Sequence, residues 1–179
     1  MHINRLVGAP IWLPPHCGEQ LPFPDDHFDC VTSRLCAHHF ADPAKAVAES
    51  ARVLRAGGRL LVSDSMSPEE AALDTFFNTF ELLRDASHVR NHRVSEWRAM
   101  LQAAGFAFCE LGGGLVVQDF EDWVGRMATP PTAVAQLRAL FREASDPSRE
   151  AFAIEAGGDR FGIPIRVVEG RLAEAAHAG

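Results

Sequence analysis

Two adjacent histidines, His38 and His39, are the side chains of this sequence best suited to acid–base chemistry. They follow a short run of β-type residues, 28–33, whose composition predicts a β-strand. In open α/β sheets, ligands bind beyond the carboxyl ends of the strands. Because imidazole titrates near neutral pH, either histidine could exchange a proton with a bound substrate. The alternative is that both histidines only pack against the sheet before a helix.

The same segment contains side chains that bind zinc in other proteins. Cys36 lies close to the two histidines, and His16 and Cys17 lie upstream. A zinc site needs four ligands of these types, and no second well-spaced pair is present. The sequence therefore predicts no metal site. It also lacks the G-x-S-x-G turn of a Ser-His-Asp hydrolase, which argues against that class.

A polar cluster, His88, Arg90 and His92, follows a phenylalanine-rich segment that contains Phe76 and Phe80. Polar groups beside an aromatic wall suit a planar or lipid-like small molecule, so these five residues are candidates for substrate binding. Two alternatives stay open. The polar residues could form a solvated loop, and the phenylalanines could belong to the hydrophobic core.

The elements that must position these side chains alternate along the chain. Strands are predicted at 28–33, 59–64, 106–111 and 163–168, with Gly112–Gly114 as a turn and Pro164 marking an edge strand. Helices are predicted from Pro43, from a capping box at Ser67, and at about 95–105, 132–143 and 146–155. This alternation predicts an α/β fold with a mostly parallel sheet flanked by helices. Residues 1–20 are expected to form an extended arm before a domain at 21–179.

Composition narrows the class of protein. The chain has 179 residues, of which 47% are hydrophobic and 23% charged, with a net charge of −7. An acidic chain of this kind is not expected to bind nucleic acid, which requires a basic surface. It has no apolar run long enough to span a membrane and no signal-peptide pattern. We therefore expect a cytoplasmic protein that does not bind membranes.

Several segments together resemble the class I S-adenosylmethionine (SAM) methyltransferases, in particular the UbiE-like or type 11 group. One of them, Arg52-Val53-Leu54-Arg55-Ala56-Gly57-Gly58-Arg59-Leu60, has alanine at Ala56 where the family usually has proline. The others are Gly18-Glu19-Gln20-Leu21-Pro22-Phe23, Phe28-Asp29-Cys30-Val31, Leu35-Cys36-Ala37-His38-His39-Phe40, Leu83 to Arg90, and Trp97 with Ala104-Gly105-Phe106. The resemblance covers about residues 18–110 and implies a Rossmann-like fold.

The resemblance also implies a cofactor and a reaction. A SAM-dependent enzyme of this group methylates a small molecule, and Gly18, Glu19, Ser33 and Arg34 match positions near the cofactor. A full member of the family begins with a strand, a glycine-rich loop and a helix, and an acidic residue ends the next strand. Neither feature occurs before Leu21. The resemblance therefore implies the second half of the fold without most of the cofactor site.

Two hypotheses follow for the function. In the first, the chain is a SAM-dependent methyltransferase of a small molecule, with His38 or His39 as proton acceptor, although the lone chain is expected to methylate little. In the second, it is a non-catalytic methyltransferase-like module that binds a ligand or a partner. The strand at 28–33 would lack its usual neighbour, and an open strand edge pairs readily. We expect a homodimer through this strand, with residues 1–13 as the alternative cover.

Overall fold

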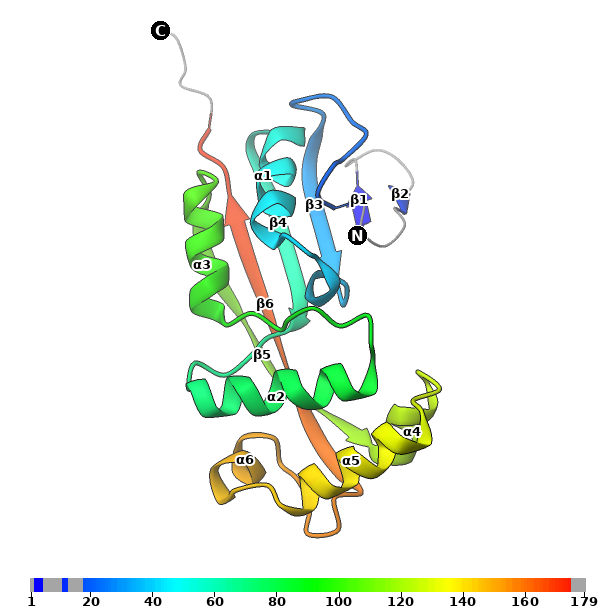
Figure 1. Cartoon of the computed structure of the whole chain (residues 1–179). Coiled ribbons are helices and arrows are strands. Elements are labelled where there is room, and N and C mark those ends of the chain that lie inside the picture. The colour runs from blue at the N-terminus through cyan, green and yellow to red at the C-terminus, as the bar shows by residue number, and fades with distance from the viewer. Residues whose placement is uncertain (1, 5–10, 13–17, 175–179) are drawn as a thin grey trace, which may run out of the picture.

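The computed structural model describes residues 2–4, 11–12 and 18–174, and the strands in this part of the chain form one six-stranded sheet (Figure 1). The strand order is β2-β1-β3-β4-β6-β5. The bounds of the strands are β1 His2–Asn4, β2 Ile11–Trp12, β3 Phe28–Arg34, β4 Leu54–Ser65, β5 Ala107–Asp119 and β6 Arg160–Arg171.

The centre of the fold is the crossover from β3 to β4. The chain leaves β3 through a short 3-10 helix, η1 (Ala37–His39), and returns through α1 (Pro43–Val53) to the parallel strand β4. The side chain of Asp42 accepts a hydrogen bond from the Lys45 amide, so Asp42 caps α1 and Pro43 occupies the first turn, as the sequence predicts. The carboxyl ends of β3 and β4 therefore meet beside η1.

The expectation of a mostly parallel sheet is not confirmed. Within the described residues β3–β4 is the one parallel pair, whereas β1–β2, β1–β3, β4–β6 and β5–β6 are antiparallel. The reason is where the later helices return the chain. β6 begins opposite the end of β5, with Arg160 paired to Asp119, so it must run back along β5. It lies between β4 and β5 and makes both pairs antiparallel.

The glycine run was expected to form a turn, but it lies inside β5. The strand continues through Gly112–Gly114 with a bulge between Glu110 and Gly112. A Cβ atom at Gly113 would collide with the carbonyl oxygen of Ile165 on β6, so glycine permits the close approach of the two strands. The glycines therefore allow β5 to pair closely with β6, and this pairing cannot be predicted from the residues around them.

Two other local signals were read wrongly. Pro164 does not mark an edge, because β6 is an inner strand. The carbonyl oxygen of Pro164 accepts a hydrogen bond from the Met66 amide, just past the end of β4. The paired residues of β4 and β6 end at this point, so the N–H that proline lacks is not needed for their pairing. Ser67 does not cap a helix: it forms an isolated bridge with Arg93, and α2 begins at Ala71.

The helices pack into two hydrophobic clusters (Figure 1). α1 packs on β4, and α3 (Val94–Ala103) packs on α1 and on β5 and β6; the cluster they share includes Val31, Leu60 and Trp97. The second cluster lies over one end of β5 and β6 and is formed by α2 (Ala71–Arg84), α4 (Phe120–Gly125), α5 (Pro131–Arg142) and α6 (Asp146–Ala151). Its centre is rich in phenylalanine. The site described below lies where η1 faces α2 and α4.

The edges of the sheet bear on the expected assembly. β1 pairs antiparallel with β3 through His2–Asn4 and Cys30–Thr32, so part of the N-terminal arm covers this strand. The rest of the arm, residues 1, 5–10 and 13–17, lies outside the described residues. The homodimer through residues 28–33 stays a prediction. At the opposite edge β5 pairs only with β6, within the described chain, and exposes Leu111, Leu115 and Val117.

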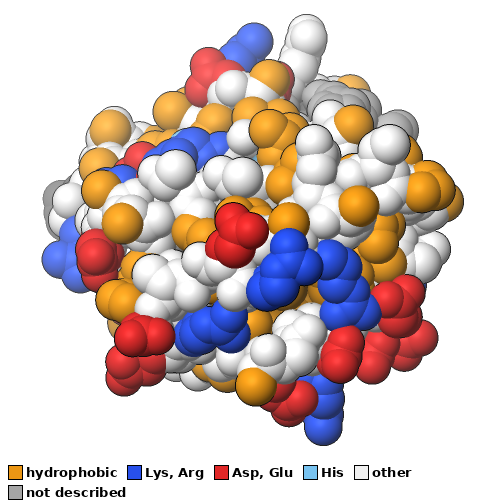
Figure 2. Space-filling model, turned by 60° about the horizontal axis from the view of Figure 1, so that its bottom comes forward, with side chains coloured by type: hydrophobic (Ala, Val, Ile, Leu, Met, Phe, Trp, Pro, Cys, Tyr) orange, Lys and Arg blue, Asp and Glu red, His pale blue; other side chains and the backbone are white. Residues whose placement is uncertain are grey.

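The surface carries no large area of one charge on the face shown in Figure 2. There, at the end of the molecule that carries α5 and α6, acidic and basic side chains are interspersed among hydrophobic ones. In the described ranges, no helix is both long enough and apolar enough to cross a membrane.

Candidate functional site

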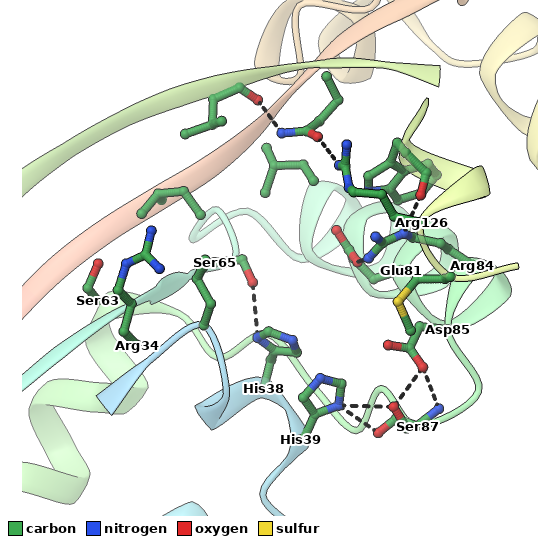
Figure 3. A pocket seen from close by; sticks show the side chains of 17 residues that line it. Arg34, His38, His39, Ser63, Ser65, Glu81, Arg84, Asp85, Ser87 and Arg126 are labelled. Carbon is green, nitrogen blue, oxygen red and sulfur yellow. Dashed lines mark hydrogen bonds and ion pairs between the residues drawn. The ribbon is translucent and has the colours of Figure 1, made fainter. Parts of the chain in front are cut away.

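A cavity of about 520 Å³ opens beside η1, at the carboxyl ends of β3 and β4 (Figure 3). Its volume is typical of sites for small molecules. Polar and apolar side chains both line it. The polar and titratable ones are Arg34, His38, His39, Ser63, Ser65, Glu81, Arg84, Asp85, Ser87, Gln118 and Arg126, and the apolar ones are Leu35, Val116, Trp123, Met127, Ile163 and Ile165.

Asp64, near the end of β4, holds η1 in place from beneath the cavity. It is only 1% exposed. One carboxylate oxygen accepts hydrogen bonds from the amides of Cys36 (3.0 Å) and Ala37 (2.7 Å). The other accepts from the Ser65 amide at 2.8 Å and from Nδ1 of His38 at 2.6 Å. All of these bonds involve a buried charged acceptor, so they fix both the turn and the imidazole ring.

This arrangement sets the tautomer and the pKa of His38. Because Nδ1 donates to Asp64, a neutral ring presents Nε2 as a free acceptor, and Nε2 has no hydrogen-bond partner among the described residues. Burial lowers the pKa of His38, but the hydrogen bond and negative charge of Asp64 outweigh it, so the pKa lies above 6.5. His38 is therefore equipped to take a proton from a ligand in the cavity.

His39 lies next to His38 in the cavity but is held differently. The two ring centroids are 4.1 Å apart. Nδ1 of His39 donates to the carbonyl oxygen of Ser87 at 2.9 Å, without a carboxylate partner. The structure thus brings both predicted histidines to the cavity, and it gives the acid–base arrangement to His38 alone.

On another side of the cavity, Glu81, Arg84 and Arg126 lie together, away from Arg34 and Ser63 (Figure 3). Glu81 is on the inner face of α2, and its side chain is 9% exposed. Burial is the main cause that raises its pKa to about 7, against the opposing charge of Arg84. The nearest Glu81–Arg84 ion-pair distance is 3.9 Å, too long for a strong hydrogen bond.

Of the predicted substrate-binding residues, His88 lies behind the cavity wall. It is 5% exposed, and its ring centroid is 5.8 Å from that of His38. Nε2 of His88 pairs with the side-chain oxygen of Asn78 at 3.1 Å. Burial, together with the nearby charge of His38, lowers the pKa of His88 to about 4, so this ring is neutral at physiological pH.

Arg90 and His92 do not line the cavity. Arg90 forms an ion pair with Asp74 at 3.0 Å, and His92 lies 3.7 Å from Glu96. Both residues therefore fasten the loop after α2 to neighbouring helices.

Phe76 and Phe80 also lie outside the cavity lining, in the phenylalanine-rich cluster. Phe80 is fully buried and makes edge-on contacts with Trp123 and Phe141, with centroids 5.9 and 5.3 Å apart. We predict that Phe80→Ala lowers the free energy of unfolding by about 3–5 kcal/mol, measured by urea denaturation. Leu82→Ala, at an exposed position of the same helix, is the control and should cost less than about 1 kcal/mol.

The four residues matched to cofactor positions are spread over two places. Arg34 lines the cavity, and Ser33, just beneath it, is 3% exposed with its hydroxyl 3.2 Å from the Cys36 sulfur. Gly18 packs against the ring of Phe40, where a Cβ atom would lie 2.9 Å from the ring. Glu19 accepts a hydrogen bond from the Asp42 amide at 2.8 Å. Gly18 and Glu19 thus support the start of α1 and do not line the cavity.

Within residues 2–4, 11–12 and 18–174, no group of three or more His, Cys, Asp or Glu side chains is placed to hold a metal ion. His16 and Cys17 lie outside the described residues.

The sequence analysis missed Asp64, Glu81, Arg84 and Arg126. A signal for Asp64 was present, since an acidic residue that interrupts an apolar strand near its end is costly unless it is paired. Glu81 and Arg84 had a weaker signal, because a charged residue at the helical spacing of Phe77 falls on the buried face of α2. No local signal points to Arg126.

The fold and this cavity define a class of protein, and comparison with known proteins agrees. A Rossmann-like β3–α1–β4 crossover with a ligand cavity at its carboxyl end is typical of nucleotide- and SAM-dependent enzymes. Residues 16–62 match the family model for a methyltransferase domain, Methyltransf_11. The chain belongs to the class I SAM-dependent methyltransferases, which confirms the resemblance seen in the sequence.

Particular relatives support this assignment. The chain is 43% identical over 136 residues to the uncharacterized methyltransferase YcgJ of Bacillus subtilis, covering 76% of this chain and 54% of YcgJ. It is 41% identical over 140 residues to YafE of Escherichia coli, covering 78% of this chain and 68% of YafE. The crystal structure of YcgJ superimposes with a TM-score of 0.84 at 38% identity, over 88% of this chain and 69% of YcgJ. The sequence match thus spans about half the length of YcgJ.

The described residues do not by themselves fit SAM. The cofactor needs a glycine-rich loop for close backbone approach and a free carboxylate for its ribose hydroxyls. The described strands are followed by no such glycine-rich loop, because Gly112–Gly114 lies within β5. The carboxylate at the end of β4, Asp64, is already bound by three amides and His38. Arg34 and Leu35 line one wall of the cavity, but they supply neither the glycine-rich loop nor the free carboxylate that SAM needs.

Proposed function

We propose that this chain forms the acceptor-binding part of a SAM-dependent methyltransferase that acts on a small molecule. The observation that supports it best is the 2.6 Å contact between His38 and Asp64 at the edge of the cavity. An acceptor hydroxyl or amine must lose a proton as it is methylated. A histidine oriented by a buried carboxylate is well suited to receive that proton.

The cavity would hold the acceptor in a defined orientation. Trp123, Ile163 and Ile165 offer an apolar surface for its body, and the reactive group would face Nε2 of His38. Asp64 keeps Nδ1 protonated and stabilises the imidazolium that forms when Nε2 takes the proton. The chain's own contribution is thus binding, orientation and proton removal.

This proposal predicts that His38 promotes ionisation of a bound phenol. 4-Nitrophenol is titrated against the protein at about pH 6, where the free phenol is mostly un-ionised, and the phenolate absorbance of the bound fraction is recorded. The wild-type protein should raise the phenolate fraction. His38→Asn should bind the phenol with similar affinity but lose this increase, because no base faces the hydroxyl.

His39→Asn is the matched control, since it removes a neighbouring imidazole that has no carboxylate partner. It should leave the phenolate fraction within about twofold of wild type. An unchanged phenolate fraction in His38→Asn would refute the role of His38.

The second candidate function is a non-catalytic methyltransferase-like module that binds a ligand. The poor fit of the described residues to SAM favours it. Both candidates bind a small molecule in the cavity, but only the first requires His38 to draw a proton from it. The 4-nitrophenol experiment therefore separates them.

A further inference from the structure

The wall formed by Glu81, Arg84 and Arg126 contains two guanidiniums, and neither has a carboxylate within hydrogen-bond distance among the described residues. Arg84 donates from Nε to the carbonyl oxygen of Trp123 at 3.1 Å, and its guanidinium lies 4.8 Å from the centroid of that ring. These contacts orient the guanidinium but do not neutralise it. Its remaining N–H groups have no hydrogen-bond acceptor among the described residues, and its side chain is only 16% exposed.

Arg126 adds a second positive charge to the same wall. Its guanidinium donates to the side-chain oxygen of Gln118 at 2.5 Å, which is again a neutral partner. Burial is the main cause that lowers the pKa of Arg84; the negative charges of Glu81 and Asp85 oppose this, and the positive charge of Arg126 adds to it. A wall with two oriented guanidiniums and unused donors is suited to an anion.

Glu81 does not cancel this charge at neutral pH. Its pKa of about 7 means that a large fraction of the carboxyl groups are protonated there. The charged and titratable groups that face it come from several elements: Arg84 and Asp85 from α2, His38 and His39 from η1, Asp64 from β4, and Arg126 after α4. Arrival of an anion beside Arg84 would disfavour the carboxylate form of Glu81 further.

We propose that the acceptor is a planar carboxylate, whose carboxylate group binds Arg84 and Arg126 while its ionisable hydroxyl or amine faces His38. This inference rests on the proposed function, because it assigns the substrate class of the same cavity. The two ends of such a ligand match two separate groups of side chains (Figure 3), and the apolar side chains of Val116, Trp123 and Ile163 also line the cavity. Its affinity falls as the pH rises above about 7, because ionised Glu81 competes for Arg84 and repels the ligand.

The test compares two probes that differ only in charge, 6-hydroxy-2-naphthoate and 6-hydroxy-2-naphthamide, by calorimetry at about pH 6.5. We expect the naphthoate to bind at least about tenfold more tightly, as a charge-assisted pair predicts. Arg84→Gln and Arg126→Gln should each remove most of this preference. Arg126 is exposed, so its replacement tests the inference even if Arg84→Gln fails to fold.

Arg98→Gln is the matched control, because Arg98 is an exposed arginine that stacks on Phe108 outside the cavity. It should keep the wild-type preference. Equal affinity for the two probes, or a preference that survives both cavity variants, would overturn this inference and leave the proposed function standing. Failure of both probes to bind would overturn the proposed function itself. The naphthoate affinity should fall less from about pH 6 to pH 8 in Glu81→Gln than in wild type, and an equal fall in the two proteins would refute the role of Glu81.

Discussion

Asp64→Asn is expected to lower the free energy of unfolding by about 3–5 kcal/mol and to abolish the increase in ionisation of bound 4-nitrophenol. An asparagine has the same shape, but its amide nitrogen cannot accept a hydrogen bond. Each carboxylate oxygen of Asp64 accepts from two donors in this buried site. In either orientation of the asparagine side chain, its NH2 group therefore faces one of these two pairs of donors. Urea denaturation measures the first effect, and the phenolate absorbance measures the second.

The pH dependence of that loss has a defined sign. The folded-state pKa of His38 lies above its unfolded value. The stabilisation from the His38–Asp64 pair is therefore complete at low pH and is lost as the pH rises through the folded-state pKa. The difference in unfolding free energy between wild type and Asp64→Asn should shrink from about pH 6 upward.

Asp85→Asn serves as the control for both measurements, because Asp85 is another carboxylate of the cavity wall but bonds only to Ser87. It should cost less than about 1 kcal/mol. Equal losses in the two variants would show that Asp64 has no special part in holding η1.

The 179-residue chain is expected to bind SAM more weakly than about 1 mM, and to show little methyl transfer alone. The described residues lack the glycine-rich loop and the free carboxylate that hold the cofactor. Each missing charge-assisted or backbone hydrogen bond costs on the order of 1–3 kcal/mol, so several together reduce affinity by many powers of ten. Calorimetry with SAM measures the affinity directly.

A full-length UbiE methyltransferase, titrated under the same conditions, is the positive control for this measurement. A micromolar affinity for the 179-residue chain would show that other residues of the chain replace the missing contacts. The proposed acceptor site would remain, because it depends on the cavity and not on the cofactor.

The sequence predicts the β3–α1–β4 crossover and the position of the histidines well, because each signal is local. Asp42 and Pro43 define the start of α1 by themselves, and the apolar run before Arg34 identifies β3. His38 then follows at the carboxyl end of a strand, where ligand sites occur. These features need no knowledge of distant residues.

The features that the sequence did not reveal depend on contacts between distant segments. Gly113 reads as a turn residue until β6 is known to lie against it. Phe80 is equally plausible in a pocket or in a core, and only its packing against Trp123 and Phe141 decides. The charged wall combines α2 with a residue after α4, and no spacing along the chain links them.

The position of β6 has a consequence for how the protein is made. β6 is the last of the described strands along the chain, yet it lies between β4 and β5. During synthesis, which proceeds at about 5–20 residues per second, the 13 residues of β5 leave the ribosome well before the strand that pairs with them. Until then both edges of β5 carry unpaired backbone groups, next to the side chains of Leu111, Leu115 and Val117, which remain exposed in the folded protein. In the nascent chain, β5 can therefore pair with β6 only after residues 120–159 have been made.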